Sequence, residues 1–208
     1  MAPLSELDVD ERVGRRGLFL TALSHTPPPP LSVVFLDMAV SLDGLVSGPD
    51  PTADPGLHDW YFDPKGDSVA VLGELQSSIG AMILGHRMAG DDGFETPYGV
   101  PHVVLTHHDR PTVTHGGASF HYETGGVEQV LARAREAAGA RDVCVAGGAE
   151  TARQFLAAGL VDEVRLHMVP VMLGGGLRLF EGVGPLRLET MRALHAPGVI
   201  HLSYRVVR

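Results

Sequence analysis

The amino-acid sequence predicts an α/β fold: a mostly parallel central sheet lies between two layers of helices, with antiparallel strands at the C-terminal end. Three observations support this fold class. Short β-branched and apolar runs alternate with segments of helical periodicity. Alternating strands and helices form parallel sheets, because each helix returns the chain to the same edge. The C-terminal part instead holds two strand-like runs with no helix between them, which favours antiparallel edge strands.

The N-terminal half of the predicted domain alternates strands with a helix. Leu72, Leu75 and Ile79 recur at helical spacing and indicate a helix that leads directly into the second strand. That strand ends at Gly85. The apolar and β-branched runs that predict strands here lie at residues 33–40, 81–84, 102–106 and 119–122.

The C-terminal half begins with an amphipathic helix that ends before Gly139. A helix over 149–158 follows the Gly147-Gly148 turn, and a hairpin is expected around Pro197-Gly198. The apolar stripe of the first helix is formed by Val127, Val130, Leu131, Ala134 and Ala138. The predicted strands of this half lie at residues 142–146, 164–169, 186–194 and 199–206.

Residues 1–30 differ from the rest of the chain. They begin with acidic residues and end in four consecutive prolines at 27–30, which favour polyproline II and cannot join a helix or a central strand. A pair of arginines at 15–16 resembles an export signal, but no small-residue cleavage site precedes the prolines. We therefore expect a flexible N-terminal extension over 1–30 and one folded domain over 31–208.

Composition and charge narrow the classes of function. Of the 208 residues, 44% are apolar and 20% are charged, which is the balance of a globular protein. The net charge is −9 and basic residues are scattered, so we expect no nucleic-acid partner. No apolar run reaches the roughly 18 residues of a membrane helix, so we expect no membrane partner. The single cysteine, Cys144, excludes an internal disulfide and favours a cytoplasmic location.

The strongest chemical signal is the Gly147-Gly148 turn between an apolar strand and a helix. Glycine has no Cβ, so a phosphate can approach the backbone closely. The first helical turn (Ala149, Glu150 and Thr151) offers unpaired N–H groups and the positive end of the helix dipole. These features predict a site for a pyrophosphate. Such turns also form for packing reasons alone, and this one lacks the G-x-G-x-x-G fingerprint.

A carboxylate follows the first strand, in the segment Ser41-Leu42-Asp43-Gly44. The carboxyl ends of strands are where α/β folds bind ligands. Asp43 there is suited to hydrogen-bond a substrate amide or to relay a proton during hydride transfer. The alternative interpretation is that Asp43-Gly44 simply forms a turn.

Two other features predict no chemistry of their own. The glycines at 174–176 follow a strand with no helix behind them, so we interpret this loop as structural. His107, His108, His115 and His121 are close in sequence but show neither the helical pairing nor the Cys/His spacing of zinc sites, so no metal is predicted.

Taken in order, several short segments resemble the bacterial dihydrofolate reductase family, which includes the reductase half of the riboflavin-biosynthesis deaminase/reductase. They span roughly residues 32–206. The resemblance implies the dihydrofolate reductase-like three-layer α/β/α fold and a homodimer. The matching segments are Ser41-Leu42-Asp43-Gly44, His58-Asp59-Trp60, Ile83-Leu84-Gly85-His86-Arg87, Val103-Val104-Leu105-Thr106-His107, Val145-Ala146-Gly147-Gly148-Ala149, Gly159-Leu160-Val161-Asp162-Glu163, and residues 170–176 with Leu179-Phe180.

The resemblance also implies a function. It implies that NADPH transfers a hydride to a small heterocycle, either a pterin or folate-like compound or a pyrimidine precursor of riboflavin. Asp43 and Trp60 would then face the substrate. The cofactor would contact Gly147, Gly148, Ala149, Glu150 and Thr151 at its pyrophosphate, and Gly85, His86, Arg87, Thr106 and His107 at its adenosine phosphates.

One segment departs from the family pattern. The usual Gly-Arg-x-Thr reads Gly85-His86-Arg87-Met88 here, so a histidine stands where an arginine would hold the 2′-phosphate of NADPH with two hydrogen bonds. Arg87 or His108 is placed to compensate. NADH therefore remains an alternative cofactor, and an accessory protein that kept the fold but lost turnover is the alternative function.

Overall fold

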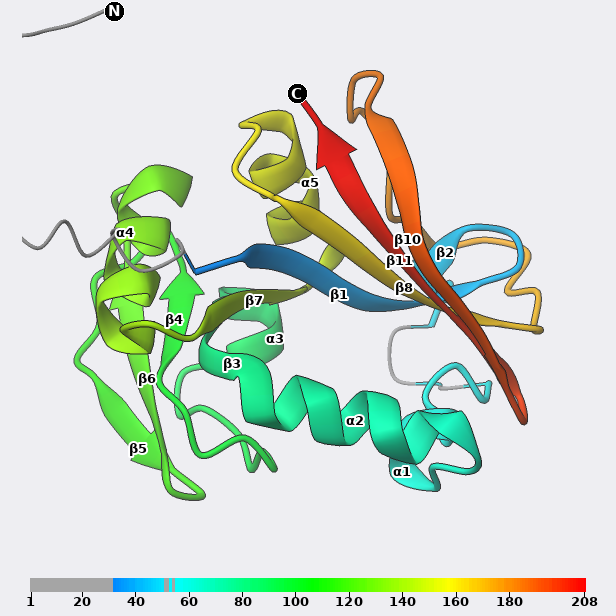
Figure 1. Cartoon of the computed structure of the whole chain (residues 1–208). Coiled ribbons are helices and arrows are strands. Elements are labelled where there is room, and N and C mark those ends of the chain that lie inside the picture. Colours follow the sequence, from blue (N-terminus) through cyan, green and yellow to red (C-terminus); the bar gives the residue numbers. More distant parts are fainter. Residues whose placement is uncertain (1–31, 51–52, 54) are drawn as a thin grey trace, which may run out of the picture.

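A nine-stranded mixed sheet forms the centre of the molecule in the computed structural model, which describes residues 32–50, 53 and 55–208 (Figure 1). The expected N-terminal extension over 1–30 lies outside the described residues. In their order across the sheet, the strands are β10 (Arg187–Ala196), β11 (Val199–Val207), β8 (Glu163–Val169), β1 (Val34–Ser41), β7 (Asp142–Gly147), β3 (Ile79–Gly85), β4 (His102–Leu105), β6 (Ala118–Glu123) and β5 (Val113–His115).

The middle of the sheet is parallel and both of its edges are antiparallel. Neighbouring strands from β8 across to β6 run parallel. At one edge β11 lies antiparallel to β8 and to β10, as predicted from the C-terminal hairpin. At the other edge β5 lies antiparallel to β6. The three residues of β5 were not predicted, because so short a strand has no periodicity to detect.

Helices cover both faces of the sheet. The helices α1 (Asp59–Phe62) and α2 (Asp67–Ser78) lie on one face, and α4 (Val127–Ala138) and α5 (Ala149–Ala157) lie on the other (Figure 1). A short helix, α3 (His86–Ala89), follows β3, and β2 (Leu45–Ser47) pairs with β9 (Leu177–Arg178) in a separate two-stranded sheet. No helix among the described residues is both long and apolar enough to cross a membrane.

One predicted boundary was wrong. Ile79 was expected to end the helix, but α2 ends at Ser78 and Ile79 has the extended backbone of the first residue of β3. The helical spacing gave the wrong boundary because Ile79 continues the apolar pattern of Leu72 and Leu75 and packs in the same cluster. A buried residue that joins a helix directly to a strand satisfies both periodicities.

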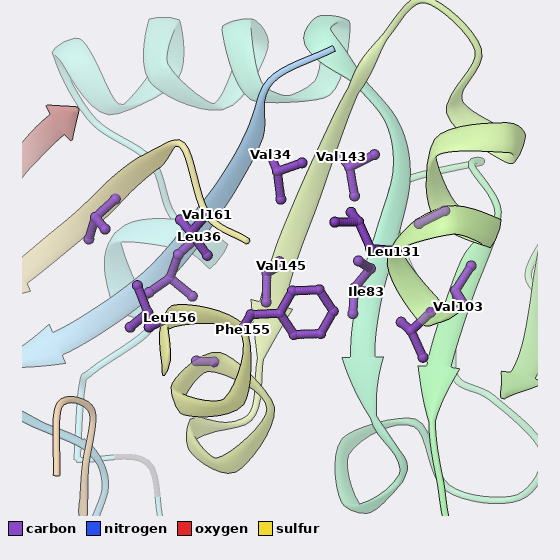
Figure 2. Close-up of a cluster of buried hydrophobic side chains, with 14 of the residues drawn as sticks. Val34, Leu36, Ile83, Val103, Leu131, Val143, Val145, Phe155, Leu156 and Val161 are labelled. Atoms are coloured by element: carbon purple, nitrogen blue, oxygen red, sulfur yellow. The ribbon is translucent and has the colours of Figure 1, made fainter. Parts of the chain in front are cut away.

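The core forms two layers because alternate residues of β1 point to opposite faces. Val34 and Leu36 pack against α5 and the neighbouring strands, together with Val145 and Phe155 (Figure 2). Phe35 instead packs on the α2 face. Each large apolar side chain that is fully buried stabilises the fold by about 1.5–3 kcal/mol.

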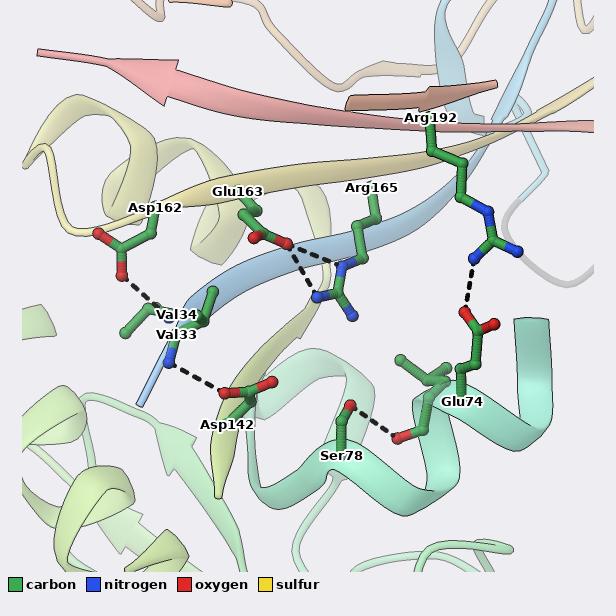
Figure 3. Close-up of polar contacts among 10 residues, drawn as sticks. Val33, Val34, Glu74, Ser78, Asp142, Asp162, Glu163, Arg165 and Arg192 are labelled. Atoms are coloured by element: carbon green, nitrogen blue, oxygen red, sulfur yellow. Dashed lines mark hydrogen bonds and ion pairs between the residues drawn. The ribbon is translucent and has the colours of Figure 1, made fainter. Parts of the chain in front are cut away.

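Two carboxylates fix the start of β1. Asp142 accepts a hydrogen bond from the backbone N–H of Val33, and Asp162 accepts one from Val34, both at 3.0 Å (Figure 3). Asp142 is the first residue of β7 and Asp162 immediately precedes β8. Because β7 and β8 lie on either side of β1, the two aspartates fix the register of β1 against both neighbours. The carboxyl ends of β1, β7 and β3 therefore gather at one edge of the sheet.

Candidate active site

Two glycine turns meet at the edge where β3 and β7 end. Leu84 is paired with Gly147 in the parallel ladder, which places Gly85 beside Gly148. A Cβ on Gly85 would lie 3.8 Å from the backbone nitrogen of Gly148 and would overlap the hydroxyl of Thr151. The glycines predicted to contact a cofactor thus lie together, at the edge of the sheet where α/β folds bind ligands.

The space at Gly148 is open. No heavy atom lies within 4 Å of a Cβ built on Gly148. Gly147 is buried, with φ at +117°, and Met38 lies 3.1 Å from a Cβ built there. The peptide bond between the two glycines is cis. An approaching group therefore meets bare backbone at Gly148 and a packed layer beneath it.

The first turn of α5 carries one feature that favours an anion and one that opposes it. The start of a helix leaves backbone N–H groups unpaired and has a positive partial charge. Glu150 places a carboxylate at that same end, although it is exposed. Arg153 lies 2.8 Å from this carboxylate and neutralises it. Ala149 and Thr151 are buried, so they contribute backbone rather than side chains to the surface of the turn.

A small charged cluster follows β3. Nε2 of His86 lies 2.7 Å from a carboxylate oxygen of Asp91, and Arg110 lies 2.9 Å from the same oxygen. The hydrogen bond with His86 is the main reason that the pKa of Asp91 lies below its usual value. Nε of Arg110 is buried without a hydrogen-bond partner among the described residues. Arg87 is exposed to solvent beside this cluster.

Thr106 and His107 extend the same edge from β4, which is parallel to β3 with Leu105 opposite Gly85. Thr106 is buried, and its hydroxyl accepts a hydrogen bond from the backbone N–H of His108 at 3.2 Å. His107 is exposed. The two side chains therefore differ in what they offer a ligand: His107 is free to contact one, whereas Thr106 shapes the turn.

Asp43 holds a loop. Its carboxylate accepts hydrogen bonds from the hydroxyl of Ser41 at 2.7 Å and from the backbone N–H groups of Leu173 and Gly174 at 3.1 and 2.8 Å. These bonds, that of Ser41 foremost, lower its pKa to about 2. The carboxyl group is therefore ionised at neutral pH and has no proton to give there. Contact between Asp43 and a substrate stays a prediction.

The loop held by Asp43 packs closely against the chain after β1. A Cβ on Gly176 would overlap the backbone oxygen of Ser47, and β9 pairs with β2 immediately beyond it. Gly176 also has φ at +127°, which disfavours other residues. These contacts support a structural role for the glycines at 174–176.

Trp60 belongs to α1 and packs toward the sheet, with only 6% of the residue exposed. Its ring centroid is 4.3 Å from that of His167 and 5.1 Å from that of His201. Its indole N–H has no hydrogen-bond partner among the described residues. Trp60 therefore supports two buried histidines, and its contact with a substrate ring stays a prediction.

The two histidines and Asp37 line a cavity of about 400 Å³ between α2 and the strands β1, β8, β11 and β10. These three residues were missed in the sequence. The available signal was a carboxylate inside an apolar strand: a buried charge is costly unless it is paired, so Asp37 required a partner. The partner could not be named, because His167 follows Asp37 only after 130 residues.

Comparison with known proteins agrees with this geometry. Solved structures with the same fold include a diaminohydroxyphosphoribosylaminopyrimidine deaminase/5-amino-6-(5-phosphoribosylamino)uracil reductase from Thermotoga maritima (TM-score 0.61, 15% identity, 85% of this chain and 57% of that one). Another is a dihydrofolate reductase from Enterococcus faecalis complexed with NADP(H) (TM-score 0.58, 14% identity, 86% and 98%).

Among curated proteins, the uncharacterized protein YwjB of Bacillus subtilis (strain 168) is 26% identical over 152 residues, which is 70% of this chain and 80% of YwjB. The family model for the RibD C-terminal domain matches residues 32–202, from two residues before β1 into β11. That match includes the glycine turns, the loop held by Asp43 and the buried histidines. The chain belongs to the RibD C-terminal domain family.

Proposed function

We propose that this protein is an NAD(P)H-dependent reductase of a small heterocycle. The observation that carries the proposal is the open backbone at Gly148, where two parallel strands end and α5 begins. A dinucleotide needs such a place because its pyrophosphate must approach unpaired N–H groups without a side chain between them. The family match and the NADP(H) complex of the dihydrofolate reductase fold support the same cofactor class.

The residues present fit the cofactor. Gly148 and the first turn of α5 would hold the pyrophosphate, and the cluster that follows β3 would hold the adenosine ribose. When bound, the cofactor supplies a hydride. The role of the protein is to fix its orientation, to exclude water and to supply a proton to the substrate.

The charged cluster is the proposed contact for the 2′ position of the adenosine ribose, where NADH and NADPH differ. A carboxylate such as Asp91 accepts a hydrogen bond from the ribose 2′-hydroxyl of NADH, whereas arginines bind the 2′-phosphate of NADPH. Here Asp91 is paired with His86 and Arg110, which share one of its oxygens. We propose NADPH as the cofactor, with Arg87 and Arg110 as the cations for its phosphate and with NADH as a second cofactor.

The cavity beneath α2 suits a small substrate. Its volume of about 400 Å³ lies within the usual range for small-molecule sites. Apolar side chains such as Leu75 and Leu194 line it beside Asp37 and the histidines, a combination that suits a flat heterocycle with hydrogen-bonding edges. We propose a pyrimidine like the one named for the Thermotoga maritima reductase, or a pterin.

A fluorescence titration with NADPH and with NADH tests the cofactor site. We expect saturable binding at micromolar concentrations, and loss of at least tenfold in affinity in Gly148→Leu, because the leucine would fill the open space (tenfold is about 1.4 kcal/mol). Gly184→Leu is the matched control, since Gly184 is exposed and nothing lies within 4 Å of a Cβ there. If neither dinucleotide binds the unmodified protein, the proposal is wrong.

One observation favours a second candidate, an accessory protein without turnover. His86 and Met88 stand where the family pattern has its phosphate-binding arginine and threonine. Incubation with NADPH and either 7,8-dihydrofolate or 5-amino-6-(5-phosphoribosylamino)uracil separates the two functions. Oxidation of the cofactor, followed by absorbance, supports the reductase. Tight cofactor binding with no oxidation on either compound supports the accessory protein.

A further inference from the structure

Four buried or nearly buried polar side chains form a continuous hydrogen-bonded chain between α2 and the sheet. Asp37 lies 3.1 Å from Nε2 of His167, and Nδ1 of His167 lies 2.7 Å from Nδ1 of His201. Nε2 of His201 lies 2.9 Å from the hydroxyl of Ser68. The residues come from β1, β8, β11 and α2, so the chain links one helix to three strands.

One assignment of ring protons satisfies every bond of this chain. The hydroxyl of Ser68 donates to Nε2 of His201, whose Nδ1–H donates to Nδ1 of His167. Nε2–H of His167 then donates to the carboxylate of Asp37. Both rings are neutral in this assignment and Asp37 is ionised. Each bond therefore has one donor and one acceptor, as buried polar groups require.

Protonation of the His201 ring is disfavoured in this chain. Burial, followed by the neighbouring His167, lowers the pKa of His201 to about 4. His201 therefore stays neutral near pH 7, and the carboxylate of Asp37 is hydrogen-bonded to His167 rather than to His201. The other charged groups that face the pair are Glu163, Arg165, Arg192, Glu74 and Asp67.

These surrounding charges are largely compensated. Glu163 and Arg165 lie 2.8 Å apart on β8, and Arg192 reaches from β10 to Glu74 on α2 at 2.6 Å (Figure 3). The paired groups form part of the wall of the cavity. Among the described residues that line the cavity, Asp37 and His167 are consequently the most deeply buried acid–base pair.

Asp37 also lies close to the proposed cofactor turn. Leu36 is in register with Val145 on β7, which precedes Gly147 by two residues. Met38, the next residue after Asp37, lies 3.1 Å from a Cβ built on Gly147. Asp37 thus lies in β1 next to the residue that contacts Gly147, with its own side chain on the opposite face of the sheet, at the cavity.

We propose that Asp37 is the catalytic acid of the reductase and that His167, His201 and Ser68 are positioning residues that hold and replenish its proton. This inference rests on the proposed function. In the reaction a hydride and its electron pair leave the reduced nicotinamide and form a C–H bond at the substrate carbon. Before this step the ionised carboxylate of Asp37 takes up a solvent proton through His167. The π electrons of the C=N or C=O bond then move to nitrogen or oxygen, which takes that proton from Asp37. His167 then reprotonates Asp37 with a proton that comes from solvent.

The other acids near the cavity fit this role less well. Asp43 holds a loop through bonds from Leu173 and Gly174 and is not among the residues that line the cavity. Glu74 is 61% exposed and paired with Arg192. Asp59 and Asp63 of the segment before α2 are exposed. A proton donor must reach the substrate and be supplied with protons. Asp37 lines the cavity and is hydrogen-bonded to His167, through which a proton can reach it.

The first test uses Asp37→Asn and Ser68→Ala, with Ser77→Ala as the control because Ser77 is exposed on the same helix. The readouts are NADPH affinity and the pH profile of kcat on 5-amino-6-(5-phosphoribosylamino)uracil. We expect Asp37→Asn to lower kcat about 10²- to 10⁴-fold, the usual contribution of a general acid, without changing NADPH affinity. Ser68→Ala should shift the acid limb of the profile, and Ser77→Ala should change neither.

The second test needs no turnover. Nitrogen-15 NMR of the histidine rings in the unmodified protein should show the Nε2–H tautomer for His167 and the Nδ1–H tautomer for His201 near pH 7. Asp37→Asn should change the chemical shift of Nε2 of His167, because the ring N–H loses its carboxylate partner. The opposite tautomers, or ring-nitrogen shifts of His167 that are identical in both proteins, would overturn the relay even if the protein is a reductase. Failure of NADPH to bind would instead count against the proposed function.

Discussion

Asp43 illustrates how a single side chain can be suited to two roles while the structure shows one. A carboxylate at the end of a central strand faces the ligand edge of an α/β sheet, which is the reason for predicting a contact with the substrate. In the structure its oxygens accept bonds from Ser41, Leu173 and Gly174. These bonds fix the loop that forms one wall of the same edge, so Asp43 shapes the site whether or not it touches a ligand.

We predict that Asp43→Asn destabilises the protein at neutral pH and that the effect fades in acid. The pKa of Asp43 is about 2 in the folded protein and 3.8 in the reference state. Its stabilising contribution is therefore fully present above about pH 4 and is lost as the pH falls toward 2. Urea unfolding at pH 7 and at pH 3 measures the difference.

Glu136→Gln is the control for this prediction. Glu136 is an exposed carboxylate on α4, which does not belong to the loop that Asp43 holds. Removing its charge should leave the unfolding midpoint nearly unchanged at both pH values. A destabilisation by Asp43→Asn that is equally large at pH 3 would show that the amide disrupts packing rather than ionic hydrogen bonds.

A second prediction at the level of the residue concerns cofactor choice. Asp91→Asn should raise the affinity for NADPH relative to NADH by on the order of tenfold, because it releases His86 and Arg110 from a carboxylate and removes a negative charge near the 2′-phosphate. Competitive fluorescence titration gives the ratio of the two dissociation constants. Asp92→Asn, at the exposed neighbouring position, should leave that ratio unchanged.

At the level of the elements, the sequence predicted what depends on local pattern. The helix over Val127–Ala138 was predicted together with its C-terminal end, since one apolar stripe and Gly139 mark its face and its end. The hairpin of β10 and β11 was predicted from its turn at Pro197-Gly198. The ladder of parallel strands followed from the alternation of strands with helices.

The sequence could not predict the groups that meet only through the fold. Asp37, His167 and His201 lie on three strands, and each alone reads as a polar residue in an apolar run. Their association follows from the antiparallel register that places His201 opposite His167 and from the parallel register of β1 with β8. The cluster of His86, Asp91 and Arg110 was missed for the same reason, because Arg110 belongs to a loop beyond β4.

Two glycines give a prediction for α2 and for the strand that follows it. Gly73→Ala should stabilise the protein by about 0.5–1 kcal/mol, because Gly73 is in an exposed helix interior with nothing within 4 Å of a built Cβ. Gly80→Ala should destabilise it, because a Cβ there would lie 2.7 Å from the backbone oxygen of Ala138 at the end of α4. Thermal unfolding of both variants measures the contrast, and stabilisation by both would show that α4 shifts at little cost.

At the level of the whole molecule, the C-terminal hairpin exposes an apolar edge of the sheet. β10 is an edge strand of the nine-stranded sheet, and nearly all of it is exposed. Long edge strands with apolar side chains pair with other chains unless something blocks them. The exposed large apolar side chains of the hairpin and its approach are Leu186, Leu188, Met191, Ile200 and Val207. We propose that this surface forms the homodimer.

The prediction is that Leu188→Lys with Ile200→Lys weakens self-association. Each lysine would place a charge in an apolar contact, where burying an unpaired charge is costly. Light scattering coupled to size-exclusion chromatography should show a dimer for the unmodified protein and a monomer for the double variant. Val69→Lys is the control, because Val69 is an equally apolar, 57% exposed residue that belongs to α2 and not to the hairpin. Met191 and Arg192 of β10 also line the cavity beneath α2, so we expect dimerisation to order that wall. The double variant should therefore also bind substrate more weakly. Its affinity for NADPH should stay the same, because the proposed cofactor site lies at the carboxyl ends of β3 and β7.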